Sequence, residues 1–481
     1  MNKKWVQISI LILGITIIVI GLVGLYNNRN VEQSETINQS INQDVIGSKD
    51  VTMLPIPALL EDENDDENIA DFSLVVQQGK TNFLGDVLTP TLGYNGNFLG
   101  PVIKVKRGEI VNMHVRNKLS DSTSVHWHGL EVSGPDDGGP HQVIDQGTLW
   151  EPSFIIDQQA STLWFHPHVI GTTSIQVYYG LAGLIIVEDE FSDALNIPKD
   201  YGVNDIPLII QDRSFNNDGS FNYTTNMMNG VIGDTILVNG AITPTLNVNQ
   251  INMRFRIVNG SNARNFNLEL SDQKEFSQIA SDGGFLEKPY VENALFISPG
   301  ERAEIIVDFS RYEEGDVINL QSGNELIMTF VVGGKSKDLT EIPDVLVKIE
   351  AIDESKATSI KTIELDGMGH MVSLNGRKFD MNRIDDNVEL NAIEIWEITT
   401  NSTMMGRMGH PFHIHGTQFQ ILSRNGNEPG DNEKGFKDTV FVGPDETVRI
   451  IVQFKNKGVF MYHCHILEHE EAGMMGQLEV K

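Results

Sequence analysis

Histidine is concentrated in four short segments of this 481-residue chain, and its spacing there suits metal binding. Ten of the 13 histidines lie in these segments, and each segment contains a His-x-His pair. Residues two apart on a β-strand point to the same face, so each pair presents two imidazoles to one place. Imidazole is a preferred ligand of copper and zinc, so the sequence predicts a metal centre built from several segments. The ten residues are His126, His128, His166, His168, His410, His413, His415, His463, His465 and His469.

The only cysteine, Cys464, lies between the two histidines of the last His-x-His pair. On a strand its sulfur points away from both neighbouring imidazoles, so it belongs to a second site on the opposite face. A thiolate, two imidazoles and a weak axial thioether form a blue-copper electron-transfer site. Cys464, His469 and Met474 supply three of these ligands, and His410 can supply the fourth. A single cysteine also excludes an intramolecular disulfide.

Strands rather than helices must position these side chains. Apolar and polar residues alternate with a period of two, as in residues 111–116, and Gly, Asn, Asp and Pro punctuate the chain at short intervals. Long helical stretches are not evident. The predicted fold class is therefore all-β, built from sandwiches or barrels.

An internal repeat indicates three related β domains in succession. Residues 111–117, 254–259 and 395–401 each show a strand pattern that contains Asn at its end. A histidine-bearing block follows the first and third copies, whereas the block after the second copy, residues 263–268, has no histidine. We expect the middle domain to lack metal ligands. The expected domains are 68–190, 200–350 and 355–481.

The composition limits the kinds of partner that this protein can bind. The chain carries 35 Lys and Arg against 66 Asp and Glu, which gives a formal net charge of -31. A surface this acidic repels phosphate, so we expect no nucleic-acid partner. Hydrophobic residues make up 40% of the sequence, which is enough for packed cores and argues against a disordered chain. We expect a monomer.

The first residues point to export. Lys3 and Lys4 precede a nearly apolar run, residues 6–26, close to the roughly 20 residues that a membrane-spanning helix needs. The lysines favour an inside N-terminus, and no small-x-small cleavage site follows the run. We therefore expect residues 1–26 to be an uncleaved anchor that holds an extracytoplasmic protein at the membrane, with cleavage and secretion as the alternative. The polar, acidic residues 27–67 are expected to form a flexible stalk.

The histidine segments resemble the copper motifs of the multicopper oxidases, and the likeness covers most of the chain. The motifs are His-Trp-His-Gly, His-Pro-His, His-Pro-x-His-x-His and His-Cys-His-x3-His-x4-Met, all present in that order. The resemblance implies three cupredoxin-like Greek-key domains, four copper ions and the four-electron reduction of O2 to water. The three-copper cluster would lie between the first and third domains.

The resemblance also implies which of the four copper ions each ligand binds. The type 1 copper, with Cys464 as the point of electron entry, would be held by His410, Cys464, His469 and Met474. The type 2 copper would be held by His126 and His413. The type 3 pair would be held by His128, His166, His168, His415, His463 and His465.

Reduction of O2 to water consumes protons, and two acidic residues match family positions near the cluster. Asp137 follows Asp136 in a glycine-rich turn, and Glu470 follows His469. We expect both to act as proton-relay groups. For Asp137 a purely structural role, capping the turn, stays open. Asp438 either orients a copper-binding histidine or belongs to a loop.

The expected reductant is Cu(I), because the chain also resembles the copper efflux oxidase branch, on residues 233–240, 281–284 and 435–440. That branch oxidises Cu(I) and carries a long methionine-rich insertion, which is missing here. Short methionine segments remain, and soft thioethers select Cu(I) while a carboxylate favours Cu(II). The candidate substrate-copper residues are Asp366, Met368, Met404, Met405 and Met408.

Three alternatives stay open. The methionines can simply pack around the type 1 pocket, and a pocket without the insertion can admit phenols or other organic donors, as in a laccase. A copper-binding protein without turnover, or a copper-free scaffold, is the remote alternative. The leading expectation is Cu(I) oxidation in copper tolerance.

Overall fold

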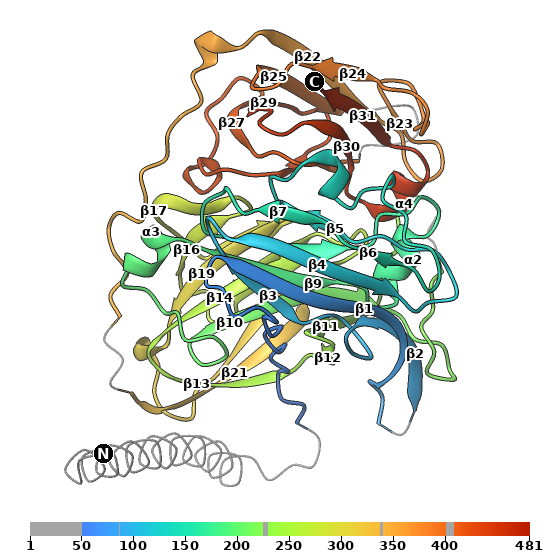
Figure 1. Cartoon of the computed structure of the whole chain (residues 1–481). Coiled ribbons are helices and arrows are strands. Elements are labelled where there is room, and N and C mark those ends of the chain that lie inside the picture. Colours follow the sequence, from blue (N-terminus) through green and yellow to red (C-terminus); the bar gives the residue numbers. More distant parts are fainter. Residues whose placement is uncertain (1–50, 86, 225–228, 337–339, 401–407) are drawn as a thin grey trace, which may run out of the picture. The chain divides into compact units, whose positions relative to one another are not determined.

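The computed structural model describes residues 51–85, 87–224, 229–336, 340–400 and 408–481 (Figure 1). In this part of the chain almost all regular structure is β, in six sheets. The sheets form three consecutive pairs, which we call the first, middle and third sandwich. Their strands lie within residues 69–188, 205–335 and 359–480. The prediction of an all-β chain is confirmed.

The first sandwich carries two of the histidine segments. Its strands are β1 (Ile69–Asn82), β2 (Leu88–Tyr94), β3 (Val102–Lys106), β4 (Ile110–Asn117), β5 (His126–His128), β6 (Leu149–Trp150), β7 (Ser153–Ile155), β8 (Ser161–His166) and β9 (Gly183–Glu188). One sheet has the order β2-β1-β4-β6 with β7 beside β4, and the other has the order β3-β9-β8-β5. Alternate residues of β1, such as Phe72 and Leu74, are buried against Ile103 and Val105 of β3.

The middle sandwich has the largest sheet. Its strands are β10 (Asp205–Arg213), β11 (Thr235–Val238), β12 (Ala241–Ile242), β13 (Thr245–Gln250), β14 (Asn252–Asn259), β15 (Phe266–Leu270), β16 (Phe276–Ser281), β17 (Gly284–Glu292), β18 (Ala294–Ile297), β19 (Arg302–Asp308), β20 (Val317–Ser322) and β21 (Glu325–Lys335). The sheet orders are β12-β11-β10-β14-β19-β16-β17 and β13-β21-β20-β15-β18. Phe255 and Phe330, one from each sheet, meet in the shared core.

The third sandwich carries the other two histidine segments. Its strands are β22 (Ser359–Asp366), β23 (Ser373–Leu374), β24 (Asp386–Val388), β25 (Ile393–Thr400), β26 (His410–Ile414), β27 (Phe419–Arg424), β28 (Thr439–Val442), β29 (Thr447–Gln453), β30 (Gly458–Cys464) and β31 (Met475–Val480). The sheet orders are β23-β22-β25-β29-β27 and β24-β31-β30-β26-β28. The α-helices of the described residues are short: α2 (Thr173–Tyr178), α3 (Glu190–Ala194) and α4 (Leu467–Glu471).

The repeat seen in the sequence has a structural counterpart. The repeated strands β4, β14 and β25 each pair in parallel with the strand that opens their sandwich: β1, β10 and β22. In the first two copies the terminal asparagine organises the following turn. Asn117 accepts from Leu119 N–H, and Asn259 accepts from Ser261 N–H, two residues further on. Each asparagine amide also donates to two backbone carbonyls, which explains Asn at the end of the pattern.

Residues 52–67 are held against the folded sandwiches, so the prediction of a flexible stalk is wrong for this stretch. The Leu54 side chain is buried in the core of the middle sandwich, and its N–H donates to Thr245 O at 2.8 Å. The Tyr201 hydroxyl donates to Pro57 O at 2.6 Å. In the acidic run the Asp62 carboxylate accepts backbone N–H groups. Composition alone misses these contacts, because the backbone makes most of them.

The apolar run at residues 6–26 and the stalk up to residue 50 lie outside the described residues. Among the residues that the structure describes, none of the helices is both long and apolar enough to span a membrane.

Candidate metal centres

Eight histidine side chains from the first and third sandwiches converge in one buried cluster. Antiparallel pairing of β5 with β8 sets His126 opposite His166, and pairing of β26 with β30 sets His413 opposite His463. The two sandwiches thereby bring together segments about 300 residues apart in sequence. The eight are His126, His128, His166, His168, His413, His415, His463 and His465, each at most 1% exposed.

The ring nitrogens of these histidines face one another. His463 Nε2 lies 3.2 Å from His168 Nε2 and 3.1 Å from His415 Nε2. His128 Nδ1 lies 3.4 Å from His166 Nε2. Several sets of three such side chains offer ligand atoms within 4.8 Å of one another. This is the arrangement that metal ions bound between imidazoles require.

The donor set fits copper. Neither ring nitrogen of buried His465 has a hydrogen-bond partner among the described residues, a costly arrangement that metal ligation would relieve. Imidazole nitrogen is a preferred donor for copper. Burial, followed by the charges of neighbouring rings, lowers the pKa of most of these imidazoles, so they are neutral and free to ligate. This holds for His128, His166, His168, His413, His415, His463 and His465.

Oxygen atoms hold the outward nitrogens and so fix the ring orientations. Asp137 serves two rings: its Oδ2 lies 2.8 Å from His415 Nδ1, and its backbone O lies 3.0 Å from His126 Nδ1. Backbone carbonyls serve others, at 2.8 Å for His166 and 3.1 Å for His463. Asp137 is thus in direct contact with the cluster, in addition to its place in the turn.

Glu470 also lies at the cluster, on the side of the third sandwich. Its Oε1 is 3.4 Å from His168 Nδ1 and its Oε2 is 3.5 Å from His463 Nδ1. Burial raises the pKa of its carboxyl well above the ordinary value, and the charges of Glu471 and Glu468 act in the same direction. Burial therefore favours the protonated form of Glu470 beside two cluster histidines.

The cysteine forms a separate buried group, as its strand position predicts. Cys464 Sγ lies 3.5 Å from His410 Nδ1 and 3.8 Å from His469 Nδ1. Cys464 N–H donates to Met474 O at 3.1 Å, which places the buried Met474 beside the cysteine. Burial raises the pKa of the thiol and, with the charge of His469, lowers the pKa of His410 to about 3.

A hairpin loop, residues 366–373, covers both histidines of this group. Asp366 of β22 pairs with Ser373 of β23. The backbone of Gly367 hydrogen-bonds to the His410 ring, and Gly369 N–H lies 3.2 Å from His469 Nε2. Asp366 Oδ1 is buried without a hydrogen-bond partner among the described residues.

The methionine candidates divide into placed and unplaced residues. Met368 is buried in the hairpin loop, and Met408 is half-buried against the core of the third sandwich. Met404 and Met405 lie outside the described residues.

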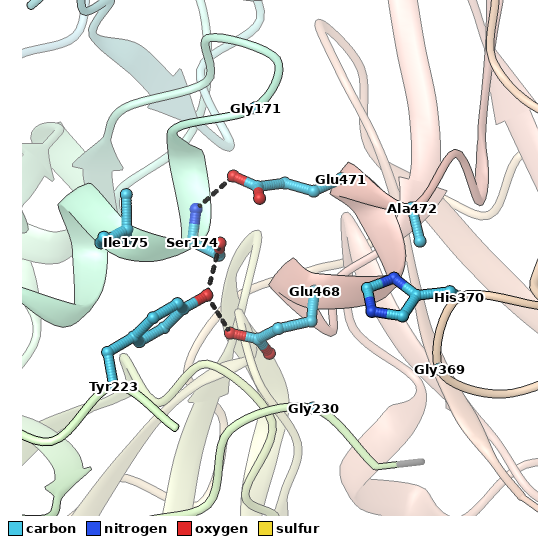
Figure 2. Close-up of a pocket in the computed structure, with 10 residues that line it drawn as sticks. All are labelled: Gly171, Ser174, Ile175, Tyr223, Gly230, Gly369, His370, Glu468, Glu471 and Ala472. Carbon is cyan, nitrogen blue, oxygen red and sulfur yellow. Dashed lines mark hydrogen bonds between the residues drawn. The ribbon is translucent and has the colours of Figure 1, made fainter. Parts of the chain in front are cut away.

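A cavity of about 280 Å³ opens beside the hairpin loop (Figure 2). Gly369 and His370 of the loop line it together with Glu468 and Glu471 of α4. The Tyr223 hydroxyl lies 2.7 Å from Ser174 Oγ and 3.0 Å from Glu468 Oε1. Sequence reasoning missed the two glutamates, although their i, i+3 spacing around His469 places both on one face of a helix turn.

Three β-sandwiches with a buried eight-histidine cluster and a separate cysteine–histidine group define a copper-dependent oxidase. The chain belongs to the multicopper oxidase family, since family models described as multicopper oxidase match residues 75–192, 188–318 and 348–481. It is accordingly a copper oxidoreductase that uses O2 as electron acceptor. The all-β fold is the cupredoxin-like fold of that family.

Individual relatives span nearly the whole chain. The multicopper oxidase mco of Staphylococcus aureus is 42% identical over 435 residues, covering 90% of this chain and 93% of that protein. The laccase structure from Pediococcus acidilactici has a TM-score of 0.87 and 39% identity, covering 90% of this chain and 94% of that chain. A Campylobacter jejuni multicopper oxidase described as a metallo-oxidase has a TM-score of 0.80 and 29% identity, covering 90% and 95%.

Proposed function

We propose that this oxidase removes electrons from Cu(I) and passes them to O2, in the service of copper tolerance. Four Cu(I) ions, one O2 and four protons give four Cu(II) ions and two water molecules. Resident copper ions, when bound, supply the one-electron steps and the site of O2 reduction. The observation that carries the choice of reductant is Asp366 Oδ1, which is buried in the loop over His410 and His469 and has no hydrogen-bond partner among the described residues.

The proposed resident metal is four copper ions, divided between the two buried groups. The type 1 ligands are His410, Cys464, His469 and Met474. The type 2 ligands are His126 and His413. The type 3 ligands are His128, His166, His168, His415, His463 and His465.

Cys464 joins the two groups through the backbone. Its sulfur faces His410 and His469, while the neighbouring His463 faces the eight-histidine cluster. Electrons that enter at Cys464 therefore need only one residue of backbone to reach a cluster ligand. This adjacency makes Cys464 the proposed point of electron entry.

The hairpin loop is the proposed substrate-copper site. A buried carboxylate oxygen without a partner costs free energy unless a ligand satisfies it, and Cu(II) accepts carboxylate oxygen. Met368, two residues further on, supplies a soft thioether that suits Cu(I). We include Met408, Met404 and Met405 as further candidates from the segment before His410.

Asp137 and Glu470 are the proposed proton-relay groups. Asp137 Oδ1 and Glu470 Oε2 are buried without hydrogen-bond partners among the described residues, while each carboxyl also faces cluster histidines. Each carboxyl therefore lies where a relay group for the cluster would have to lie.

Oxidation of phenols or other organic donors is the second candidate, and the cavity beside Gly369 favours it. Its volume of about 280 Å³ is near the lower end of small-molecule pockets. The Pediococcus relative is described as a laccase, which also favours an organic donor. Against an apolar donor, two carboxyl side chains, Glu468 and Glu471, make the lining of this cavity polar.

O2 uptake by the copper-loaded protein separates the candidates. Chelator-buffered Cu(I) is supplied in one cell, and a phenol in the other, with and without Cu(II). We expect fast uptake with Cu(I) and phenol turnover only after Cu(II) is added. Fast phenol turnover without Cu(II), with slow Cu(I) turnover, would favour the oxidation of organic donors, as in a laccase.

Two variants of the loop sharpen this test. Asp366→Asn and Met368→Leu should lower kcat/KM for Cu(I) about tenfold or more, a loss typical of one removed metal ligand or its support. The matched control is Met371→Leu, a methionine of the same loop that is exposed. Equal Cu(I) kinetics in all three variants would mean that the methionines only pack.

We also propose that the protein is a monomer and lies outside the cytoplasm, tethered by residues 1–26. The apolar length of residues 6–26 and the preceding lysines support this proposal. Membrane fractionation of the protein with and without residues 1–50 tests the tether. The mass in solution of the protein that lacks these residues, measured without detergent, tests whether it is a monomer.

A further inference from the structure

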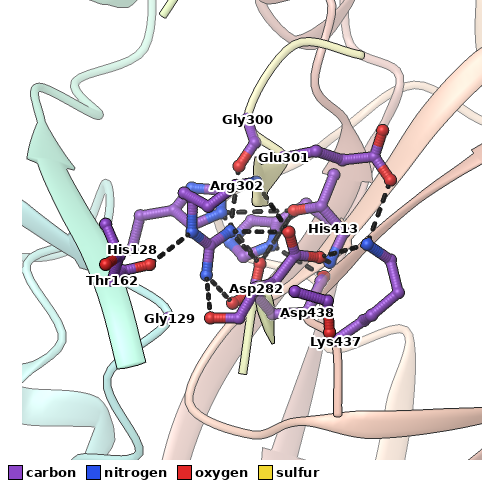
Figure 3. Close-up of polar contacts among 12 residues, drawn as sticks. His128, Gly129, Thr162, Asp282, Gly300, Glu301, Arg302, His413, Lys437 and Asp438 are labelled. Carbon is purple, nitrogen blue, oxygen red and sulfur yellow. Dashed lines mark hydrogen bonds and ion pairs between the residues drawn. The ribbon is translucent and has the colours of Figure 1, made fainter. Parts of the chain in front are cut away.

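The middle sandwich holds none of the proposed copper ligands, yet it sends a charged side chain to Asp438, which contacts two cluster histidines. Arg302, the first residue of β19, is 1% exposed. Its Nη1 donates to Asp438 Oδ1 at 2.7 Å, and its Nη2 donates to Asp438 Oδ2 (Figure 3). A guanidinium and a carboxylate that meet through both oxygens form a strong, directional pair.

Asp438 in turn holds two cluster rings from outside. Its Oδ1 lies 3.0 Å from His128 Nε2, and its backbone O lies 2.9 Å from His413 Nδ1. The remaining ring nitrogens, His128 Nδ1 and His413 Nε2, face other cluster histidines, at 3.4 Å from His166 and 3.5 Å from His126. Asp438 therefore helps to set which nitrogen of each ring points inward, together with Thr439 Oγ1, which lies 3.2 Å from both outer nitrogens.

The same geometry offers a competing role for Asp438. His128, His413 and Asp438 place ligand atoms within 4.8 Å of one another, close enough to hold a metal ion on the outer side of the rings. A metal there would pull both rings away from the cluster. Arg302 opposes metal binding there, because its two terminal nitrogens already donate to both carboxylate oxygens and its positive charge repels a cation.

We infer that Arg302 is a positioning residue for the copper cluster: it holds the Asp438 carboxylate in place as the acceptor for His128 Nε2, so that His128 presents Nδ1 to copper. Arg302 donates to both carboxylate oxygens, so Oδ1 stays directed at His128 Nε2, 3.0 Å away. An oxygen that holds the outer nitrogen of a ligand ring fixes the orientation of that ring.

The guanidinium is itself fixed by backbone oxygens of two sandwiches. Its Nε donates to Thr162 O at 3.2 Å in the first sandwich, and other N–H groups donate to Gly300 O at 2.9 Å and Asp282 O at 3.1 Å. All of these acceptors are uncharged. The excess positive charge of Arg302 is thus directed at Asp438, with Asp282 as a second carboxylate 3.7 Å away.

Gly129, the glycine of the His-Trp-His-Gly motif, makes room for this pair. A Cβ there would lie 2.7 Å from Asp438 Oδ2 and 2.8 Å from Arg302 Nη2, and φ is +94°. A larger residue would therefore both strain the backbone and separate carboxylate from guanidinium. The motif supplies space for Arg302 as well as histidines.

Arg302→Met is the principal test, and Arg256→Met is its matched control. Arg256 is also a buried arginine of the middle sandwich: two of its nitrogens donate to the Asp205 oxygens at 2.8 Å, and it reaches Thr162 Oγ1 at 2.9 Å. It therefore matches the chemistry of Arg302 without touching the cluster. Both variants should unfold at lower temperature than the wild type.

The two variants should differ in copper and in ring state. In Arg302→Met we expect type 1 absorption to remain, affinity for cluster copper to fall 10- to 100-fold, and the type 2 electron paramagnetic resonance signal to change. In the copper-free protein, nitrogen NMR of labelled histidine reports which ring nitrogen carries the proton. In Arg302→Met we expect the proton of one buried ring to leave Nε2. In Arg256→Met all of these should match the wild type.

Equal copper content, equal spectra and equal ring protonation in the two variants would overturn the inference and leave Arg302 a structural residue. If Arg302→Met does not fold, Arg302→Lys retains the charge, loses the fork and should change the same signals less. The inference rests on the ligand assignment proposed above. Failure of the wild type to bind three copper ions at the cluster would overturn that assignment, which is a distinct result.

Discussion

Asp137 Oδ2 accepts a hydrogen bond from His415 Nδ1 at 2.8 Å, so a carboxylate of the first sandwich holds a ring that the third sandwich supplies. The same oxygen lies 3.3 Å from Nδ1 of His126. One buried carboxylate therefore ties together two rings that come from chain segments almost 300 residues apart. It can orient both rings, and in the relay proposed above it would also pass protons to the cluster.

Replacing Asp137 by Ala should separate these roles from electron entry. The proposed type 1 site, at Cys464, lies elsewhere, so it should still bind copper and be reduced at the wild-type rate. Turnover of O2 should fall about 10- to 100-fold, the usual loss when a support of a metal ligand is removed. Stopped-flow reduction and O2 uptake measure the two steps.

The control for this variant is Asp136→Ala. Asp136 precedes Asp137 and accepts from Ser133 Oγ at 2.6 Å rather than from a cluster ring. It should lose little turnover. Wild-type turnover in Asp137→Ala would leave that residue with the turn-capping role alone.

Copper loading of the cysteine site should release one proton. Burial raises the pKa of the Cys464 thiol, so it is protonated at neutral pH and must lose its proton to bind copper. Burial lowers the pKa of His410 to about 3, so this ring has no proton to lose. The affinity of the site for Cu(I) should therefore rise about tenfold per pH unit between pH 6 and 8.

Competition with a Cu(I) chelator at several pH values measures this slope. The variant Cys464→Ser removes the thiol and should abolish both the slope and the blue colour. A wild-type affinity that does not change with pH would show that the thiol is already ionised.

The docked N-terminal segment should contribute to stability. Leu54 is 7% exposed in the core of the middle sandwich, so Leu54→Ala should lower the free energy of unfolding by about 2 to 3 kcal/mol. Leu59, in the same segment, is 42% exposed, and Leu59→Ala should cost less than about 0.5 kcal/mol. Urea unfolding compares them. Equal, small losses of unfolding free energy in both variants would support the predicted flexible stalk up to residue 67.

Glu292, at the end of β17, should make stability depend on pH. Burial raises the pKa of its carboxyl from 4.5 to about 7, and its Oε1 is buried without a partner among the described residues. The folded protein thus holds a proton that the unfolded chain loses. Ionisation costs stability progressively as pH rises from about 4.5 to 7, and the full cost persists above pH 7.

Glu292→Gln should remove that cost. The variant should match the wild type at pH 4 and exceed it at pH 8 by about 1 kcal/mol, a value reduced for the partial exposure of the group. Thermal unfolding at both pH values measures the difference, with Glu287→Gln, exposed on the same strand, as control. A variant that gains nothing at pH 8 would contradict the raised pKa.

The sequence alone determined the features that depend on local spacing. Pairs such as His126 and His128 must share a face because side chains alternate along a strand, and Cys464 must face away from His463 for the same reason. The period-two pattern and the repeated asparagine, as at Asn117, indicated strands and their succession. These inferences need only backbone geometry within a few residues.

Tertiary structure decided the rest, because contacts between distant segments leave no mark in local spacing. Composition suggested a stalk where Leu54 in fact enters a core. Sequence left Asp438 between an orienting role and a loop role, and offered no reason to single out Arg302, which lies 136 residues earlier in a sandwich without cluster histidines. Only the packing of the three sandwiches against one another brings that charge to Asp438, beside the histidine cluster.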